Sequence, residues 1–332
     1  MKKKHLIQAI CGAAALAWCA YRDWKYPIQP AYWLMNKFVV PAGFLKIPLI
    51  QKANRMMERM PLPEVPDGMT RETMWAVSKD GEKVRLTVYG MEEEKEPMPC
   101  LYYIHGGGFC MGDAWYIHDH VAEYAKKAHC KVVFVHYRTS DDHPFPVPFE
   151  DCVAGLQYVW ENCEWLGVDP ERIAIGGDSA GGALAAACSL WAREEGAIPL
   201  CFQMLVYPVT DSRMETESMK KYRDCPSWNS GLNQKMWEIY LRNGDFGMAG
   251  YAAPMLAERF DQLPAAYVEV EEFDCLHDEG LAYADALCAA GVSVQVEDVK
   301  GTFHGFDVFE KTKATKRMIE IRCSALRRAF WE

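Results

Sequence analysis

Short apolar runs, each followed by a segment long enough for a helix, dominate the chain beyond Pro99. This order is typical of β-α units. Continuous apolar runs belong to strands that are covered on both faces, so the pattern predicts a mostly parallel central sheet flanked by helices. The runs that we expect to form strands are Leu101 to Ile104, Val132 to Val135, Ile173 to Ile175, Cys201 to Val206, Ala266 to Val270 and Val292 to Val296.

Two runs before this region have a different pattern. Met74 to Val77 and Val84 to Val88 flank Asp80-Gly81, a pair suited to a turn with positive φ. They predict an antiparallel hairpin at one edge of the sheet. The proline-rich stretch 61–66 predicts a linker, so we expect the main domain to occupy residues 61–332 and residues 1–60 to form an N-terminal part.

The N-terminus begins with lysines at positions 2 to 4 and an apolar run over residues 6–21. The run is shorter than the ~20 residues that span a bilayer, and it ends without a small-residue cleavage site. It therefore predicts either a helix that associates with a membrane surface or a helix that packs over the functional site. We leave these two alternatives open.

Two further segments lack strand patterning. Residues 31–60 have apolar positions interrupted by Pro41 and Pro48, which predict several short helices. In residues 211–253 the alternation of strand and helix stops, which predicts an insertion. We expect this insertion and the N-terminal part to form a helical cap over the sheet.

Charge and cysteine content narrow the function classes. The 332 residues include 36 lysines and arginines against 46 acidic residues, and the net charge of -10 predicts no nucleic-acid partner. The 13 cysteines are an odd number without a Cys-x-x-Cys pair. They favour a reducing compartment, so we expect a cytoplasmic protein, with membrane association through residues 6–21 as the alternative, and we predict no metal site.

The segment Gly177-Asp178-Ser179-Ala180-Gly181 follows a predicted strand and precedes an alanine-rich helical stretch. A serine on such a sharp strand-to-helix turn projects its hydroxyl from the carboxyl edge of the sheet. The ordinary alternative is a glycine-rich helix entry with Ser179 at the helix N-terminus. The pattern favours Ser179 as a nucleophile.

His105-Gly106-Gly107-Gly108 follows the strand that ends at Ile104 and should face the same edge. We expect the N–H groups of Gly107, Gly108 and Ala180 to stabilise the negative oxygen of a tetrahedral intermediate. A tight turn or a phosphate-binding loop is the alternative, but no Lys-Ser/Thr pair follows the glycines.

A serine nucleophile needs a base, and the base needs an acid that fixes its tautomer. In chain order Asp274 and then His304 follow two late strands, which predicts Asp274 as the acid and His304 as the base. We expect the last helix to begin near Val308, after the histidine loop. Glu271, Glu272 and Asp278 are rivals for the acid. Asp278 is better explained as a helix cap, and the glutamates lie nearer the strand.

With these residues in place, the chain from about Met74 to Phe309 resembles the hormone-sensitive-lipase-like family of bacterial α/β-hydrolase esterases. The matching blocks are His105-Gly-Gly-Gly-Phe-Cys-Met-Gly-Asp113, His136-Tyr-Arg138, His143-Pro-Phe-Pro146, Gly176-Gly-Asp-Ser-Ala-Gly-Gly182, Tyr207-Pro-Val-Thr-Asp211, Asp274-Cys-Leu-His-Asp-Glu-Gly280 and Gly301-Thr-Phe-His-Gly-Phe306. The resemblance implies an α/β-hydrolase fold, a Ser179, His304 and Asp274 triad, the same oxyanion donors, and a cap built from the N-terminus and an insertion.

We therefore expect a serine carboxylic-ester hydrolase that acts on short- to medium-chain acyl esters through an acyl-enzyme and needs no cofactor. Phe109, Trp237 and Tyr240 are candidate walls of the substrate pocket. An amidase, peptidase or deacetylase with the same triad stays open, as does a small-molecule receptor. The expected partner is a small-molecule acyl ester, and a homodimer is left open.

Overall fold

The computed structural model describes residues 2–94, 96–195 and 198–332, and the side chains of the first helix from Ala14 onward. Its described strands form one eight-stranded sheet in the order β1-β2-β4-β3-β5-β6-β7-β8. The strands are β1 (Met69–Val77), β2 (Lys83–Met91), β3 (Met98–Ile104), β4 (Lys131–His136), β5 (Val168–Asp178), β6 (Leu200–Val206), β7 (Ala265–Glu271) and β8 (Val294–Val299). Every run expected to be a strand corresponds to one of them. The last expected run begins at Val292, whereas β8 begins at Val294.

The sheet is antiparallel only at one edge. β1 pairs with β2, and β2 pairs with β4, in antiparallel register, whereas all pairs from β4 to β8 are parallel. The prediction of a mostly parallel sheet with an edge hairpin is confirmed. Parallel strands end at one common edge, so the loops after β3, β5, β7 and β8 lie close together there.

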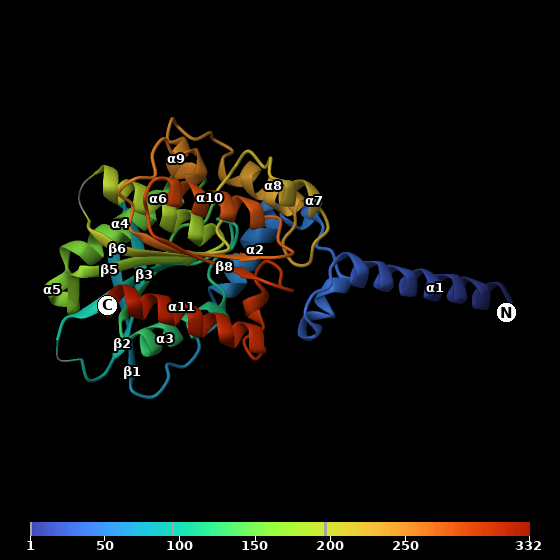
Figure 1. Ribbon diagram of the computed structural model, residues 1–332, viewed down its shortest axis with the longest axis horizontal. Helices are drawn as coiled ribbons and strands as arrows, with labels where there is room; N and C mark the ends of the chain where they lie inside the picture. The colour runs from blue at the N-terminus through green and yellow to red at the C-terminus, as the bar shows by residue number, and fades with distance from the viewer. Residues whose placement is uncertain (1, 95, 196–197) are drawn as a thin grey trace.

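Helices cover both faces of the sheet (Figure 1). Two apolar cores, one on each face, hold the layers together. On one face lie α3 (Trp115–Ala128) and α11 (Lys313–Trp331), and on the other lie α4 (Val147–Glu161), α6 (Ala180–Glu194) and α10 (His277–Ala289), while the short α5 (Cys163–Leu166) leads into β5.

Two helix starts differ from the expectation. The last helix, expected near Val308, begins at Lys313, because the Thr312 side chain accepts a hydrogen bond from the Thr315 N–H at 3.2 Å and caps it there. A single 3-10 turn, Phe306–Val308, precedes it. Asp278 does not cap α10; it lies in the first turn and accepts a hydrogen bond from the Ser218 N–H at 2.7 Å.

The N-terminal residues form helices and short turns. The elements are α1 (Lys2–Lys25), three 3-10 turns (Pro30–Tyr32, Met35–Lys37 and Ala42–Phe44) and α2 (Ile47–Met57). The short helices expected in residues 31–60 are confirmed. Figure 1 shows α1 extending away from the rest of the molecule. Across the described residues, no helix is both long and apolar enough to cross a bilayer.

Between β6 and β7 the chain makes small helices instead of a strand. They are α7 (Glu217–Lys221), α8 (Ser230–Tyr240), α9 (Ala249–Ala252) and the 3-10 turn Pro254–Leu256. Hydrogen bonds join this segment to the N-terminal part. Asp224 accepts hydrogen bonds from Arg22, Lys25 and Tyr26, and Asn229 donates one to the Val40 carbonyl at 2.9 Å.

Candidate active site

Ser179 lies on the turn between β5 and α6. Its φ of 55° and ψ of -120° are strained for a residue with a Cβ, at a cost of about 1–3 kcal/mol. The turn keeps this conformation because its backbone contacts the ends of β6 and β3. The Ser179 N–H donates to the Val206 carbonyl at 2.8 Å, and a Cβ at Gly181 would lie 2.1 Å from the Ile104 carbonyl oxygen. Glycine at 181 therefore lets the helix start press against the end of β3.

The structure brings the predicted base and acid to this serine. Ser179 Oγ lies 2.8 Å from His304 Nε2, and His304 Nδ1 lies 2.6 Å from Asp274 Oδ2. All three side chains are buried. With its Nδ1–H donated to Asp274, the imidazole presents an unprotonated Nε2 that can accept the serine hydroxyl.

Hydrogen bonds orient the Asp274 carboxylate toward His304, whereas the rival carboxylates do not bind the imidazole. Its Oδ1 accepts the Leu276 N–H at 3.0 Å, which leaves Oδ2 for the imidazole. Glu272 instead accepts the Gly301 N–H at 2.8 Å. Glu271 is fully buried, neither of its oxygens has a partner among the described residues, and burial raises its pKa well above the usual range. Asp274 is therefore the carboxylate available to the histidine.

The glycine loop lies directly against the serine turn. A Cβ at Gly106 would be 3.1 Å from the Ser179 Cβ, and Gly107 has a φ of 109°, in the region that favours glycine. Within the described part of the chain, the N–H groups of Gly107, Gly108 and Ala180 have no hydrogen-bond acceptor. These three N–H groups are therefore available to a further acceptor, and their role as oxyanion donors stays a prediction.

Asp178 connects this loop to the serine turn. Its Oδ1 accepts the Gly106 N–H at 3.1 Å and the Tyr103 hydroxyl at 3.0 Å. Complete burial, with a smaller contribution from Asp307, raises the pKa of Asp178 to about 6. The sequence motif contains this residue, but the motif alone does not reveal what the carboxylate holds.

Asn54 on α2 is a second support that the sequence did not reveal. Its Nδ2 donates to the Cys110 carbonyl at 2.9 Å and to Asp141 at 3.0 Å, and its Oδ1 accepts the Gly112 N–H at 3.1 Å. This buried amide fixes the chain that follows the three glycines. Nothing in the spacing of residues 31–60 indicated this contact.

The candidate pocket residues form an aromatic cluster. Phe109 stacks on Tyr240 with ring centroids 3.9 Å apart, and Trp237 packs against both at 5.6 and 6.0 Å. All three are buried, and neither the Tyr240 hydroxyl nor the Trp237 indole N–H has a partner among the described residues. Their role as pocket walls stays a prediction.

Trp228, from the segment between β6 and β7, lies next to His304. It was not predicted from the sequence as a site residue. Its ring centroid is 6.1 Å from that of His304. A Cβ at Gly108 would lie 2.9 Å from the tip of the indole. The indole therefore covers both the imidazole and the glycine loop.

The histidine loop is anchored from the opposite face of the sheet. Asp307, three residues after His304, is paired with Arg322 of α11 at 2.8 Å, and Arg322 also binds Glu269 of β7. All three are almost fully buried. Burial alone would raise the pKa of Asp307, but the adjacent Arg322 keeps it below its usual value.

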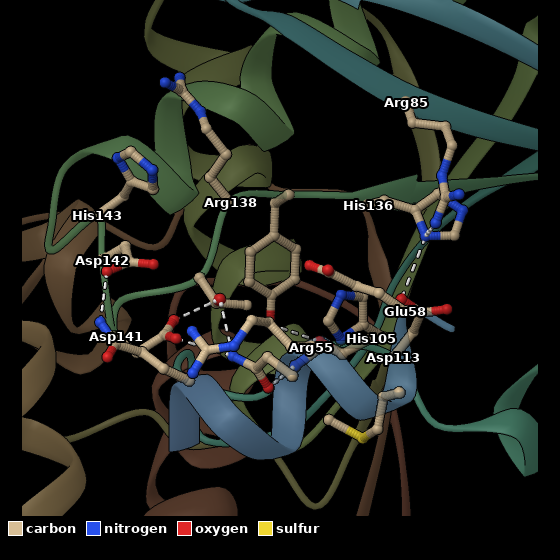
Figure 2. A pocket seen from close by; sticks show the side chains of 16 residues that line it. Arg55, Glu58, Arg85, His105, Asp113, His136, Arg138, Asp141, Asp142 and His143 are labelled. Carbon is tan, nitrogen blue, oxygen red and sulfur yellow. Dashed lines mark hydrogen bonds and ion pairs between the residues drawn. The ribbon is translucent and has the colours of Figure 1, made fainter. Parts of the chain in front are cut away.

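A polar cavity of about 290 Å³ lies on the other side of the glycine loop, between α2 and the ends of β2 and β4 (Figure 2). Neither Ser179 nor His304 lines it. In its wall, Asp113 accepts hydrogen bonds from His118 at 2.7 Å and His136 at 3.2 Å. These interactions fix the end of the glycine loop.

The described residues contain no group of three or more His, Cys, Asp or Glu side chains arranged to hold a metal ion. All cysteines whose side chains are described are unpaired.

Comparison with known proteins shows which family the chain resembles. Residues 101–308 match the family model described as the alpha/beta hydrolase fold. The chain is 36% identical to Carboxylesterase NlhH of Mycobacterium tuberculosis over 228 residues, which cover 67% of this chain and 71% of that protein.

Two solved structures have the same fold. A bacterial heroin esterase superposes with a TM-score of 0.85 at 34% identity, covering 92% of this chain and 99% of that one. Esterase LipW from Mycobacterium marinum superposes with a TM-score of 0.82 at 28% identity, and the match covers 92% of this chain and 96% of that one. The chain therefore belongs to the hormone-sensitive-lipase-like family of serine ester hydrolases with the α/β-hydrolase fold.

Proposed function

We propose that Ser179, His304 and Asp274 form the catalytic triad of a carboxylesterase. The observation that carries this proposal is the continuous hydrogen-bonded path from Ser179 Oγ through the imidazole to the Asp274 carboxylate, at 2.8 and 2.6 Å. The similarity to a carboxylesterase and to heroin esterase supports an ester as the substrate class.

In the proposed cycle His304 removes the Ser179 proton as Oγ attacks the ester carbonyl carbon. The C–O bond to the alcohol then breaks, and His304 returns the proton to the departing oxygen, which leaves an acyl-enzyme. Water, deprotonated by His304, attacks the acyl carbon; the bond from that carbon to Ser179 Oγ then breaks, His304 returns the proton to Oγ, and the acid is released. Asp274 stabilises the imidazolium in both halves.

The N–H groups of Gly107, Gly108 and Ala180 bind the oxyanion in this proposal. Their lack of other acceptors within the described chain supports the assignment. They are preorganised, so they stabilise the negative oxygen without reorganisation during the reaction.

We further propose that residues 1–60 and 211–253 act as a cap on a catalytic domain formed by the rest of residues 61–332. The Asp224 and Asn229 contacts between the two segments support this division. A cap that brings Trp228 over the site limits the space for the acyl group, which favours short- to medium-chain acyl esters. Phe109, Trp237 and Tyr240 are proposed as walls of that space.

Hydrolysis of a p-nitrophenyl ester series by the wild type and by Ser179→Ala tests the nucleophile and the acyl preference together. We expect the variant to lose activity by about 10³-fold or more and to keep its fold. Ser189→Ala is a matched control, because Ser189 is a buried serine of α6 that bonds only to the Ala185 carbonyl. Full activity in Ser179→Ala would overturn the proposal.

The same assay with the matching p-nitroanilides separates an esterase from an amidase, because p-nitroaniline is a poorer leaving group than p-nitrophenol. We expect no comparable anilide turnover. Association with a membrane surface and association with a second copy of the chain both stay predictions.

A further inference from the structure

Large apolar side chains are exposed mainly near the N-terminus. Of the 19 strongly exposed ones among the described side chains, 11 lie within residues 14–60 and 8 within the rest of the chain. Leu16 is 74% exposed and Trp24 is 80% exposed. We call these 11 side chains the N-terminal face: Leu16, Trp18, Tyr21, Trp24, Trp33, Leu34, Phe38, Phe44, Leu49, Met56 and Met60.

Contacts join α1 to the segment that follows it, so the exposed apolar side chains of residues 16–38 belong to one part of the molecule. The Trp18 indole N–H donates to the Lys37 carbonyl at 3.1 Å, and the Lys37 ammonium lies 4.8 Å from the Trp33 ring centroid. Arg22 is fully buried and binds the Asn36 carbonyl. The described half of α1 is therefore fixed relative to residues 33–38.

α2 also exposes large apolar side chains, on its outward side. Leu49 and Met56 are seven residues apart, which places them on the same side of the helix, and both are more than half exposed. Ile50 and Asn54 point the other way and are buried. The helix thus exposes apolar side chains on one side, and on the other it binds the loop after the three glycines through Asn54.

The charge of this region is opposite to that of the rest of the protein. Residues 1–60 contain ten lysines and arginines and two acidic residues, a net charge of +8. Since the whole chain has a net charge of -10, residues 61–332 have a net charge of -18. Such asymmetry orients the N-terminal face toward an anionic surface and turns the remainder away.

We propose that the N-terminal face docks onto the surface of a bilayer that contains anionic phospholipid. Exposed tryptophan and tyrosine with lysine and arginine between them match the headgroup region, where the rings enter the acyl boundary and the cations bind phosphate. In this proposal α1 lies along the bilayer surface, because its described half is fixed to residues 33–38, which expose Trp33, Leu34 and Phe38. A second copy fits this face less well, because two surfaces of equal positive charge repel.

This inference extends the predicted membrane association and does not depend on the triad. Sedimentation of the full chain with phosphatidylcholine vesicles, with and without phosphatidylglycerol, tests it. We expect binding to the anionic vesicles that weakens strongly between about 0.1 M and about 0.5 M salt, because exposed charges are screened. Ser179→Ala should lose ester hydrolysis and keep this binding, so the two proposals can fail separately.

Variants identify the contacting residues. Leu16→Ser/Trp24→Ser and, separately, Leu34→Ser/Phe38→Ser should each lower the partition coefficient by about tenfold or more. Trp165→Ser is the matched control, because Trp165 is 65% exposed on α5 and should not change binding. Equal binding to neutral vesicles, or no effect of either double variant, would overturn the proposal. So would a dimer that these substitutions dissociate, since the face would then bind a second copy.

Discussion

Asn54 accepts the backbone N–H of Gly112 at 3.1 Å and so joins α2 to the loop that contains the proposed oxyanion donors. The same side chain donates to the Cys110 carbonyl and to Asp141. One amide therefore satisfies backbone groups on both sides of a turn that has little regular structure. The N-terminal part of the chain thus takes part in shaping the site.

Asn54→Ala should lower kcat by about ten- to a hundredfold with a smaller change in KM, because displacement of an oxyanion donor affects the transition state most. Gln51→Ala, on the same helix, is the control, since Gln51 bonds only to Asp142. Steady-state kinetics on a p-nitrophenyl ester measures both. Loss of stability with unchanged kcat would mean that Asn54 only supports the fold.

Gly108→Ala should lower kcat/KM by about 10²-fold. Its Cβ would meet the Trp228 indole at 2.9 Å in a backbone with φ of 59°, so the donor must move. Gly112→Ala is a close control, because a Cβ there meets no atom within 4 Å. Equal rates in the two variants would argue against Gly108 as an oxyanion donor.

Asp178→Asn should change how stability depends on pH. The folded pKa of about 6 lies above that of an unfolded aspartate, so the protonated form stabilises the fold below about pH 4. This contribution is lost as the pH rises through 6. Between pH 4 and pH 8 the variant should therefore gain stability relative to the wild type, on the order of 3 kcal/mol.

Urea unfolding of both proteins across this pH range measures that difference. Asparagine keeps an acceptor for the Gly106 N–H and the Tyr103 hydroxyl, so the comparison isolates the charge. A constant difference at all pH values would show that Asp178 does not titrate in this range.

Arg322→Met should destabilise the protein by about 3–5 kcal/mol, because it leaves Glu269 and Asp307 buried without their cation. Arg328→Met on the same helix is the control, since Arg328 is exposed and bonds only to Gln295. Thermal unfolding of the three proteins measures the effect. A similar stability of Arg322→Met and the wild type would contradict a structural role for the buried cation.

The strands could be predicted because buried parallel strands are continuous apolar runs, and the meeting of Ser179, Asp274 and His304 followed from their positions after such strands. Asn54 and Arg322 could not be predicted in the same way. Asn54 bonds to Gly112, 58 residues away in sequence, and Arg322 bonds to Glu269, 53 residues away. No local pattern in the sequence encodes such a pair.

The boundaries that were wrong have a related cause. The start of α11 is set by the Thr312 side chain, and Asp278 bonds to Ser218 of the segment between β6 and β7. A hydrophobic pattern specifies which face of a helix is buried, but hydrogen bonds of single side chains decide where the helix begins.

The left-handed backbone at position 179 is imposed by its surroundings, because the Val206 carbonyl and the tight contact at Gly181 hold it in place. The Ser179 hydroxyl makes no capping hydrogen bond to the backbone of the helix that follows. Alanine or cysteine in its place inherits the same torsion angles and the same energetic burden. The chemistry of the nucleophile can thus be exchanged at this position while the architecture of the turn persists.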